Sequence, residues 1–399
     1  MEKKKRTLFL LTILSFAAVL LTWHINNPHR LYFDEIYYVP ASKAINMGNP
    51  DPNWVAPPLG KILIGDSIQI FGNNPFSWRL PSVLASILSI YFFFLMTFNL
   101  FSKETNTTSF SPELTAFIAS LFYLLDGMTY MQSRIGMLDM MMTGFLMGAF
   151  YFFLTERYLL CSIFMGLSLS CKWAGIFSVF FFLPLIPVSD GFKKYLAAIF
   201  KIYIPAFILY TAIFIFSAFG YKLFLFNSLG SIFAHFFQSQ IKMLKFYLKP
   251  IGFQPYEAPW WKCLLLIRPI WYTYSQVSLT RIQGILMLPN LFIWWPALIS
   301  CFFLFLKLSD KLARLILYGV FWIIIPWILS SRPGFIYYLL PISPFLILAL
   351  IYWIRNSKIA AWLAFSIISL GFLLYYPLYS NLPITYPYFW SLIWLKSWI

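Results

Sequence analysis

The chain has 399 residues, of which 61% are hydrophobic and 11% are charged, and its mean hydropathy is +0.76. This composition excludes an ordinary soluble globular protein and indicates a polytopic membrane protein. The formal net charge of +16 comes from Lys and Arg residues scattered between apolar stretches, so it argues against a nucleic-acid-binding domain and carries information on membrane topology.

The N-terminus combines a basic start with an apolar run. Residues 3–6 are Lys-Lys-Lys-Arg, and apolar residues follow as far as Trp23. The run is longer than the core of a typical signal peptide and lacks a small-residue cleavage site. We therefore expect an uncleaved first span, with its basic flank in the cytoplasm.

Eleven apolar runs are long enough to cross, or nearly cross, a bilayer. They lie at residues 7–24, 78–101, 112–130, 136–154, 159–172, 173–188, 196–219, 285–307, 311–330, 335–354 and 359–377. The stretch 159–188 is interrupted by Cys171-Lys172-Trp173 and forms either two short helices or one long helix. The sequence therefore predicts about eleven transmembrane helices.

The distribution of Lys and Arg favours two helices in 159–188. With the N-terminus inside and eleven spans, most basic residues of the short loops fall on the cytoplasmic side, as the positive-inside rule requires. A single helix there would reverse the membrane orientation of every loop that follows it. In this topology the two long segments, 25–77 and 220–284, are both external.

The two long segments hold most of the polar and Pro-rich sequence. The first contains amphipathic stretches such as Ile62–Phe71. The second carries Lys242, Lys245 and Lys249, followed by an aromatic run from Phe253 to Tyr274. We expect both to form helices and loops on the membrane surface. In this scheme residues 1–399 form a single domain, 25–77 is the external catalytic loop, and 285–399 is a C-terminal transmembrane bundle.

An acidic pair, Asp34-Glu35, follows the first apolar run. Ionisable groups held at a membrane mark candidate sites for chemistry. Adjacent side chains point about 100° apart on a helix and to opposite faces of a strand, so one carboxylate would act on a reacting atom and the other would support it. The alternative is that the pair caps a helix beginning near Ile36, where negative charge is favourable.

Further ionisable residues are expected on the same external side. They are the acids Asp51, Asp66, Asp126, Asp139 and Glu257 and the bases Arg79, Arg134, Arg268 and Arg332. Arg offers a planar, permanently charged fork for phosphate, and a carboxylate can accept a proton from a hydroxyl. The set suits a reaction between a polar acceptor and a phosphate-bearing substrate presented from the lipid.

Six motifs follow one another along the chain: Phe33-Asp34-Glu35, Pro57-Pro58-Leu59-Gly60-Lys61, Trp78-Arg79-Leu80-Pro81-Ser82, Gln132-Ser133-Arg134-Ile135-Gly136-Met137-Leu138-Asp139, Cys171-Lys172-Trp173-Ala174-Gly175 and Arg268-Pro269-Ile270-Trp271-Tyr272. These motifs resemble those of one enzyme family, the protein O-mannosyltransferases (glycosyltransferase family 39). They cover nearly the whole chain in the family's order.

The resemblance implies an all-α membrane protein of the GT-C glycosyltransferase type. Such enzymes move mannose, with inversion, from a polyprenyl or dolichyl phosphate carrier to Ser or Thr hydroxyls of proteins on the non-cytoplasmic face. By matched position it implies Asp34 as the catalytic base, Glu35 as its acidic neighbour and Arg79 as the group at the carrier phosphate. Further candidates for binding the carrier phosphate or the sugar are Lys61, Arg134, Asp139, Lys172 and Arg268.

The chain departs from the family pattern at two places. Ala56 stands where the family usually has His before Pro-Pro-Leu-Gly-Lys, so any hydrogen bond made by that imidazole is absent or replaced. The segment 220–284 is too short for the MIR domain of eukaryotic members, which indicates a compact prokaryotic member.

Other functional classes and cofactors stay open. A lipid-linked sugar transferase of the same architecture would modify a lipid or glycan, and a transporter would place its charges near the bilayer midplane. A divalent cation held by Asp34 and Glu35 is also left open, and no other cofactor is expected. The cysteines occur singly, which predicts buried thiols rather than a zinc site or disulfides. They are Cys161, Cys171, Cys263 and Cys301.

Overall fold

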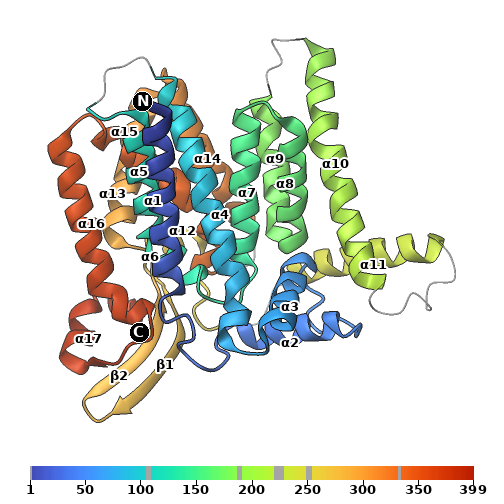
Figure 1. Cartoon of the computed structure of the whole chain (residues 1–399), viewed down its shortest axis with the longest axis horizontal. Helices are drawn as coiled ribbons and strands as arrows, with labels where there is room; N and C mark the ends of the chain where they lie inside the picture. Colours follow the sequence, from blue (N-terminus) through green and yellow to red (C-terminus); the bar gives the residue numbers. More distant parts are fainter. Residues whose placement is uncertain (1, 105–108, 187–190, 220–228, 249–253, 331–333) are drawn as a thin grey trace. The chain divides into compact units, whose positions relative to one another are not determined.

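The structure is a computed structural model of the chain (Figure 1). It describes residues 2–104, 109–186, 191–219, 229–248, 254–330 and 334–399, so Arg332 and parts of the segment 220–284 lie outside the described residues. The chain folds as two compact units, the first formed by Met1–Pro28, Ile90–Ser133 and Phe253–Ile399 and the second by His29–Ser89 and Arg134–Gly252. Helix α4 (Pro75–Ser102) begins in the second unit and continues into the first.

The first unit is built mainly from long apolar helices. They are α1 (Glu2–Thr22), α5 (Pro112–Leu124), α13 (Leu291–Leu304), α14 (Lys311–Leu329), α15 (Ser343–Ile354) and α16 (Lys358–Tyr379). Short elements connect them: α6 (Gly127–Gln132), α12 (Trp260–Leu264), α17 (Tyr386–Leu392) and the 3₁₀ turns η4 (Phe305–Lys307), η5 (Ile336–Ile342) and η6 (Lys396–Trp398). Helix α15 forms the centre of this unit, because it packs against α5, α13 and α14 and buries nearly all of its side chains.

Asp126 joins the helix ends of this core. Its buried carboxylate accepts hydrogen bonds from the Asn290 N–H (3.0 Å), the Trp294 indole N–H (3.1 Å) and the Ser343 hydroxyl (3.1 Å). These bonds link the N-termini of α6, α13 and α15. Asp126 therefore has the contacts of a structural group.

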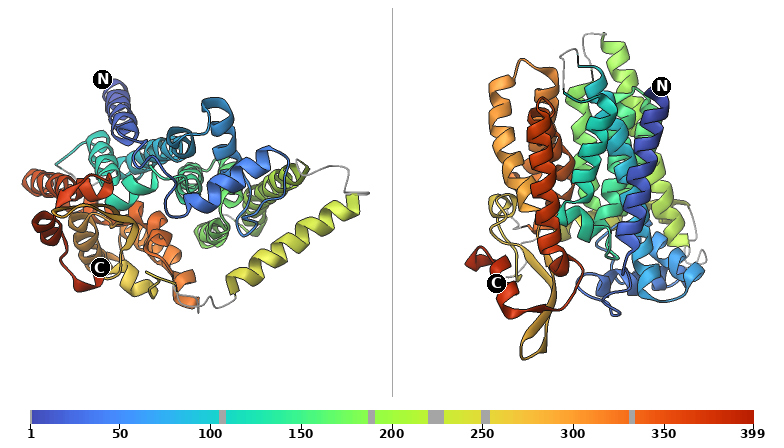
Figure 2. Two further views of the ribbon diagram at one scale, coloured as in Figure 1. Left: turned by 90° about the horizontal axis from the view of Figure 1, so that it is seen from below. Right: turned by 60° about the vertical axis from the view of Figure 1, so that its left-hand side comes forward.

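A three-stranded antiparallel sheet corrects the all-α prediction. Strand β1 (Ile270–Ser278) pairs with β2 (Arg281–Met287), and β3 (Ile384–Thr385) lies beside β2. The hairpin projects from one end of the helices of the first unit (Figures 1 and 2). Aromatic and β-branched residues favour a strand in β1, where helices and loops were expected. The apolar run predicted from residue 285 therefore starts as a strand, and its helix begins at Leu291.

The second unit contains a smaller helix bundle. Its helices are α7 (Asp139–Leu154), α8 (Tyr158–Cys171), α9 (Ile176–Phe182, between the 3₁₀ turns η1, Trp173–Gly175, and η2, Leu183–Leu185) and α10 (Phe192–Phe219). Helix α8 packs between α7 and α10. Gly148 permits the close approach of α7 and α8, because an added Cβ would lie 2.3 Å from a ring carbon of Phe164. Helices α2 (Glu35–Asn46), α3 (Leu59–Phe71) and α11 (Leu229–Leu248) lie across one end of this bundle (Figure 1).

Helix α11 has the amphipathic character expected of the second long segment. Phe236 and Met243 are buried against the unit, and a neighbouring face of the helix is apolar and exposed. That face consists of Phe233, Phe237, Ile241, Leu244 and Leu248. The Lys242 ammonium lies 4.1 Å from the centre of the Trp54 ring, so α11 also contacts the first long segment. A helix with such a face suits the membrane–water interface.

The break predicted within 159–188 is confirmed. Helix α8 ends at Cys171 because Lys172 adopts an extended conformation (φ −151°, ψ 138°), and the chain resumes as η1 and α9. The side chain of Lys172 leaves the helix at this point and reaches the start of α7.

Within the described residues, six helical stretches are long and apolar enough to cross a membrane. They are Lys3–Thr22, Pro75–Ser102, Phe192–Ser217, Lys311–Leu329, Ile336–Ile354 and Lys358–Tyr379. Shorter apolar helices occupy the remaining predicted runs: Pro112–Leu124, Asp139–Leu154, Tyr158–Cys171, Trp173–Leu185 and Leu291–Lys307. The chain is thus a mostly helical multi-pass membrane protein. The number of spans, their orientation and the single-domain organisation stay predictions.

Candidate active site

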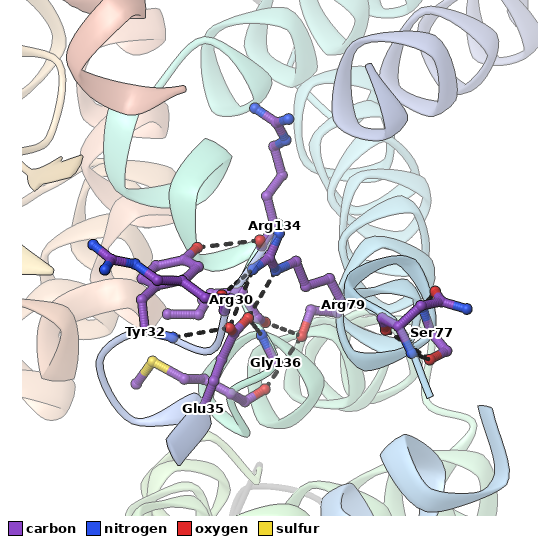
Figure 3. A network of polar contacts seen from close by, with 11 residues as sticks. Arg30, Tyr32, Glu35, Ser77, Arg79, Arg134 and Gly136 are labelled. Atoms are coloured by element: carbon purple, nitrogen blue, oxygen red, sulfur yellow. Dashed lines mark hydrogen bonds and ion pairs between the residues drawn. The ribbon is translucent and has the colours of Figure 1, made fainter. Parts of the chain in front are cut away.

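Glu35 and Arg79, two of the predicted site residues, form a buried ion pair in the second unit (Figure 3). Arg79 Nε lies 2.8 Å from Glu35 Oε1, and Arg79 Nη2 lies 3.2 Å from Glu35 Oε2. Two parallel N–H···O bonds of this kind fix the orientation of both groups. Both side chains are 0% exposed, so each charge is compensated chiefly by the other.

Neighbouring backbone groups complete the network around this pair. The N–H groups of Gly136 and Tyr32 donate to Glu35 Oε1 (2.9 Å) and Oε2 (3.3 Å), so each carboxylate oxygen accepts two hydrogen bonds. Arg79 Nη2 also donates to the carbonyl oxygen of Arg30 (3.2 Å), and its guanidinium carbon lies 5.0 Å from the Tyr32 ring centre. The network joins the loop before α2, the first turns of α4 and the turn before α7.

Gly136 is required where it stands because two backbones approach closely. A Cβ at this position would lie 2.9 Å from the carbonyl oxygen of Trp78. We expect Gly136→Ala to displace the N–H that holds Glu35 and to lower the melting temperature of the purified protein. The matched control is Gly334→Ala, whose added Cβ approaches only the Tyr338 ring, at 3.3 Å. Equal effects of the two substitutions would contradict a special role of Gly136.

Asp34 precedes the ion pair and differs from Glu35 in its surroundings. It occupies the N-cap position of α2, yet its side chain makes no capping hydrogen bond to the helix. Its carbonyl oxygen accepts the N–H groups of Tyr37 (3.0 Å) and Tyr38 (3.1 Å), and its side chain is half-buried. Because Glu35 is held by Arg79, its contacts are those of an ion pair rather than of a helix cap, whereas the role of Asp34 stays a prediction.

Asp139 and Lys172 form a second buried ion pair in this unit. Lys172 Nζ lies 2.6 Å from Asp139 Oδ1, which ties the end of α8 to the first residue of α7. The other oxygen, Asp139 Oδ2, is buried and has no hydrogen-bond partner among the described residues. A buried acceptor of this kind is costly unless a ligand or water donates to it.

Lys61 forms a third ion pair, and its contacts are those of a structural brace. Its ammonium donates to the carbonyl oxygens of Asn53 and Ala56, both at 2.7 Å, and also to Asp51 Oδ2. These three acceptors match the three N–H groups of a lysine. Burial lowers the pKa of Lys61, while the Asp51 carboxylate acts in the opposite direction. The side chain is 0% exposed, so it does not extend to headgroups in the structure.

We expect Lys61→Met to destabilise the protein by about 2–3 kcal/mol, because Asp51 and two carbonyl groups would lose their donor. The check is the thermal unfolding of the purified protein, with the exposed Lys194→Met as control. An unchanged melting temperature would remove the bracing role and return Lys61 to the candidates for substrate binding.

The remaining predicted residues occupy different places. The carbonyl oxygen of Arg134 accepts the Tyr32 hydroxyl (3.4 Å), while its buried side chain extends away from the Glu35–Arg79 pair (Figure 3). Arg268 belongs to the first unit, where it donates to the carbonyl oxygens of Ser397 (2.8 Å) and Ile399 (3.1 Å). The substrate-binding roles of both arginines stay predictions.

The sequence did not single out Arg30 and Tyr32 as members of the site, and it named Asp51 only as one of the external acids. Arg30 and Tyr32 contribute backbone groups, whose use depends on the fold rather than on residue type. The available signal was proximity, since Tyr32 lies three residues before Glu35 and Asp51 lies ten before Lys61.

Cation binding at the acidic pair would require a rearrangement. Both oxygens of Glu35 are occupied by Arg79 and backbone N–H groups, so a divalent ion would have to displace them. Within the part of the chain that the structure describes, no group of three or more His, Cys, Asp or Glu side chains could hold a metal ion. The four cysteines are free and buried.

Comparisons with known proteins show distant sequence relatives. The chain is 25% identical over 186 residues to a polyprenol-phosphate-mannose–protein mannosyltransferase of Mycobacterium tuberculosis, covering 38% of this chain and 34% of that protein. It is 27% identical over 192 residues to the Corynebacterium glutamicum protein of the same name, covering 38% and 35%. The match thus spans about a third of the relatives' length. No protein-family model matches the chain.

Solved structures of low sequence identity show the fold. The protein O-mannosyltransferase Pmt1–Pmt2 complex of S. cerevisiae, bound to the sugar donor, matches with a TM-score of 0.82 at 13% identity, over 98% of this chain and 92% of that chain. ArnT from Cupriavidus metallidurans bound to undecaprenyl phosphate matches with a TM-score of 0.54 at 16% identity, over 92% and 64%. The architecture is therefore of the GT-C type.

Proposed function

Since the chain is a distant homologue of the polyprenol-phosphate-mannose–protein mannosyltransferases and has a GT-C fold, we propose that it is a glycosyltransferase using a polyprenyl-phosphate-linked sugar. In its finer form the proposal names mannose as the sugar and a Ser or Thr hydroxyl of a protein as the acceptor. The reaction then takes place on the non-cytoplasmic face of the cell membrane, where the basic-residue distribution of the sequence puts residues 25–77.

The observation that carries the proposal is the arrangement of the acidic pair. Glu35 is immobilised by Arg79 and by two backbone N–H groups, while the adjacent Asp34 is half-buried at the N-cap position of α2. A rigid first turn holds a second carboxylate in a defined position, which is what a general base needs. This arrangement supports Asp34 as the base and Glu35 as a positioning residue.

In the proposed reaction, Asp34 accepts the hydroxyl proton as the acceptor oxygen forms a bond to the anomeric carbon of the sugar. The bond between that carbon and the carrier phosphate oxygen breaks, and the polyprenyl phosphate leaves with the electron pair. A lipid phosphate leaves as an anion, so it needs a nearby cation rather than a proton. The motif assigns this cation to Arg79, which Glu35 and Arg30 orient.

The Asp139–Lys172 pair is the second element of the proposed site. Asp139 Oδ2 is a buried acceptor with no donor among the described residues, and sugars carry hydroxyl groups that donate hydrogen bonds. We assign Asp139 to a sugar hydroxyl and Lys172 to the orientation of Asp139 through the 2.6 Å ion pair. Lys61 has a structural role in this scheme, since its three donors are used within the protein.

The experiment that tests the function is a transfer assay with purified full-length chain in lipid vesicles. Polyprenyl-phosphate-linked mannose is offered with a Ser/Thr-rich peptide and, in parallel, with the same peptide carrying Ala at every Ser and Thr. We expect mannose on the first peptide only. Transfer to a lipid or glycan acceptor but to no peptide would replace the protein acceptor with the lipid-linked sugar transferase alternative. Release of no sugar from the carrier under any condition would contradict the enzyme itself.

A further inference from the structure

An apolar groove of about 630 Å³ lies between α1, α5 and α16 of the first unit. Its volume falls in the range of about 300–1,000 Å³ that is typical of pockets for organic ligands. Helix α1 packs on α5, and the walls of the groove come from side chains such as Ile13, Phe117 and Phe372. Every lining side chain is apolar or aromatic except those of Thr12 and Ser369.

The groove opens toward the surroundings rather than into the core. Phe16, Trp362 and Leu373 line it and are 44%, 66% and 64% exposed. They belong to α1 and α16, which are both long and apolar enough to span a membrane. The medium in contact with the groove is therefore bilayer hydrocarbon, and a chain of lipid is the occupant that such walls accept.

One end of the groove is basic. Lys3, Lys4 and Lys5 are exposed in the first turn of α1, and the exposed Lys358 is the first residue of α16. In Figure 1, α1 and α16 start at the same end of the first unit's helices. Ser109, next to the lining residue Phe110, donates to the carbonyl oxygens of Arg355 (3.2 Å) and Asn356 (2.9 Å) just before α16, so this end of the groove lies beside the start of α16.

The described carboxylates near this end do not cancel that charge. Glu104 is paired with Arg355 at 3.4 Å, and Glu113 is 7% exposed in the first turn of α5. Trp362, one turn beyond Lys358, is a residue type that is enriched at headgroup level. The basic end therefore lies where phosphate groups of a bilayer would be.

We propose that this groove is a binding site for an anionic membrane phospholipid. One hydrocarbon chain occupies the space between α1, α5 and α16, and the phosphate lies among Lys3–Lys5 and Lys358. Lipid tails are as apolar as the groove, so the tail is held by van der Waals contacts rather than by a hydrophobic driving force. The preference for one lipid over another comes from the charge of the headgroup. The site lies in the first unit and is separate from the residues of the proposed reaction.

The test is native mass spectrometry of the full chain taken from bilayers of equal phosphatidylglycerol and phosphatidylcholine. We expect one retained phosphatidylglycerol per chain, with clear preference over phosphatidylcholine. Replacing Lys4, Lys5 and Lys358 by Gln is expected to reduce that preference at least ten-fold, since each basic residue near an anionic surface contributes about five-fold. Replacing Lys193, Lys194 and Lys201 by Gln, at the exposed start of α10, is the charge-matched control.

A groove-filling variant tests the tail. Ser369→Trp is expected to abolish the retained lipid, while Leu370→Trp, at the next residue and 58% exposed outside the groove lining, is expected to keep it. Equal retention of the two lipids by the unaltered chain, or full retention by Ser369→Trp, would overturn the proposal. A dimer without bound lipid would overturn it in favour of a second copy of the chain as the occupant.

Discussion

Replacing Asp34 with Asn is expected to lower the turnover rate of mannosyl transfer by about 10²–10⁴-fold, the usual contribution of a general base. Asn has the same shape as Asp but cannot accept the hydroxyl proton. The fold is expected to remain, because the substitution keeps the shape of the side chain and Glu35 retains its contacts. The rate is measured at saturating carrier and peptide, beside the thermal unfolding of the same preparation.

The control for this experiment is Asp66→Asn. Asp66 is an exposed carboxylate on α3 of the same unit, where it accepts a hydrogen bond from Asn46 at 3.2 Å. Removing it takes away one negative charge without touching the acidic pair, so we expect near-normal transfer. If Asp34→Asn transferred mannose as fast as the unaltered chain, Asp34 would not be the base.

The helices of this protein were predictable because their apolar runs are long and uninterrupted. The break at Lys172 was also predictable. A single helix over 159–188 would move the basic loops that follow it to the external side, against the positive-inside rule. The hairpin β1–β2 was not predictable, because an aromatic run near a membrane is equally compatible with an interfacial helix and with a strand. Whether the run forms a helix or a strand depends on hydrogen bonding to a second strand, which is a tertiary property.

The site residues were predictable as types and positions, but their partners were not. Glu35 and Arg79 are 44 residues apart, and Asp139 and Lys172 are 33 apart. Sequence reasoning assigned Arg79, Asp139 and Lys172 to the substrate and Glu35 to the support of Asp34. The structure pairs these charges with one another within a low-dielectric interior. Charges removed from water need such compensation, so burial explains the pairing.

Ala56 stands where the resembled family usually has His, and here its backbone carbonyl group helps to hold the loop before α3. Its carbonyl oxygen accepts a hydrogen bond from Lys61 at 2.7 Å, and its side chain is buried. The loop before α3 is thus held by Lys61 and Asp51 without an imidazole. The sequence identified the departure, and the structure supplies the contacts that fix this loop.

Breaking the Glu35–Arg79 pair from one side is expected to cost about 3–5 kcal/mol of stability, because the remaining charge stays buried without its partner. Glu35→Leu leaves the guanidinium of Arg79, and Arg79→Met leaves the carboxylate of Glu35. We expect a lower melting temperature in both variants and loss of transfer. Arg157→Met, at the exposed start of α8, is the control and is expected to leave both properties near normal.

The double variant Glu35→Leu/Arg79→Met separates stability from activity. Removing both charges leaves no uncompensated ion, so we expect it to be more stable than either single variant and still inactive. Arg79→Lys adds a second distinction, since it keeps the charge but cannot form the two parallel bonds that orient Glu35. Recovery of transfer in the double variant would show that the pair serves only the fold. Continued inactivity with recovered stability would place the pair in the positioning of Asp34 and the carrier phosphate.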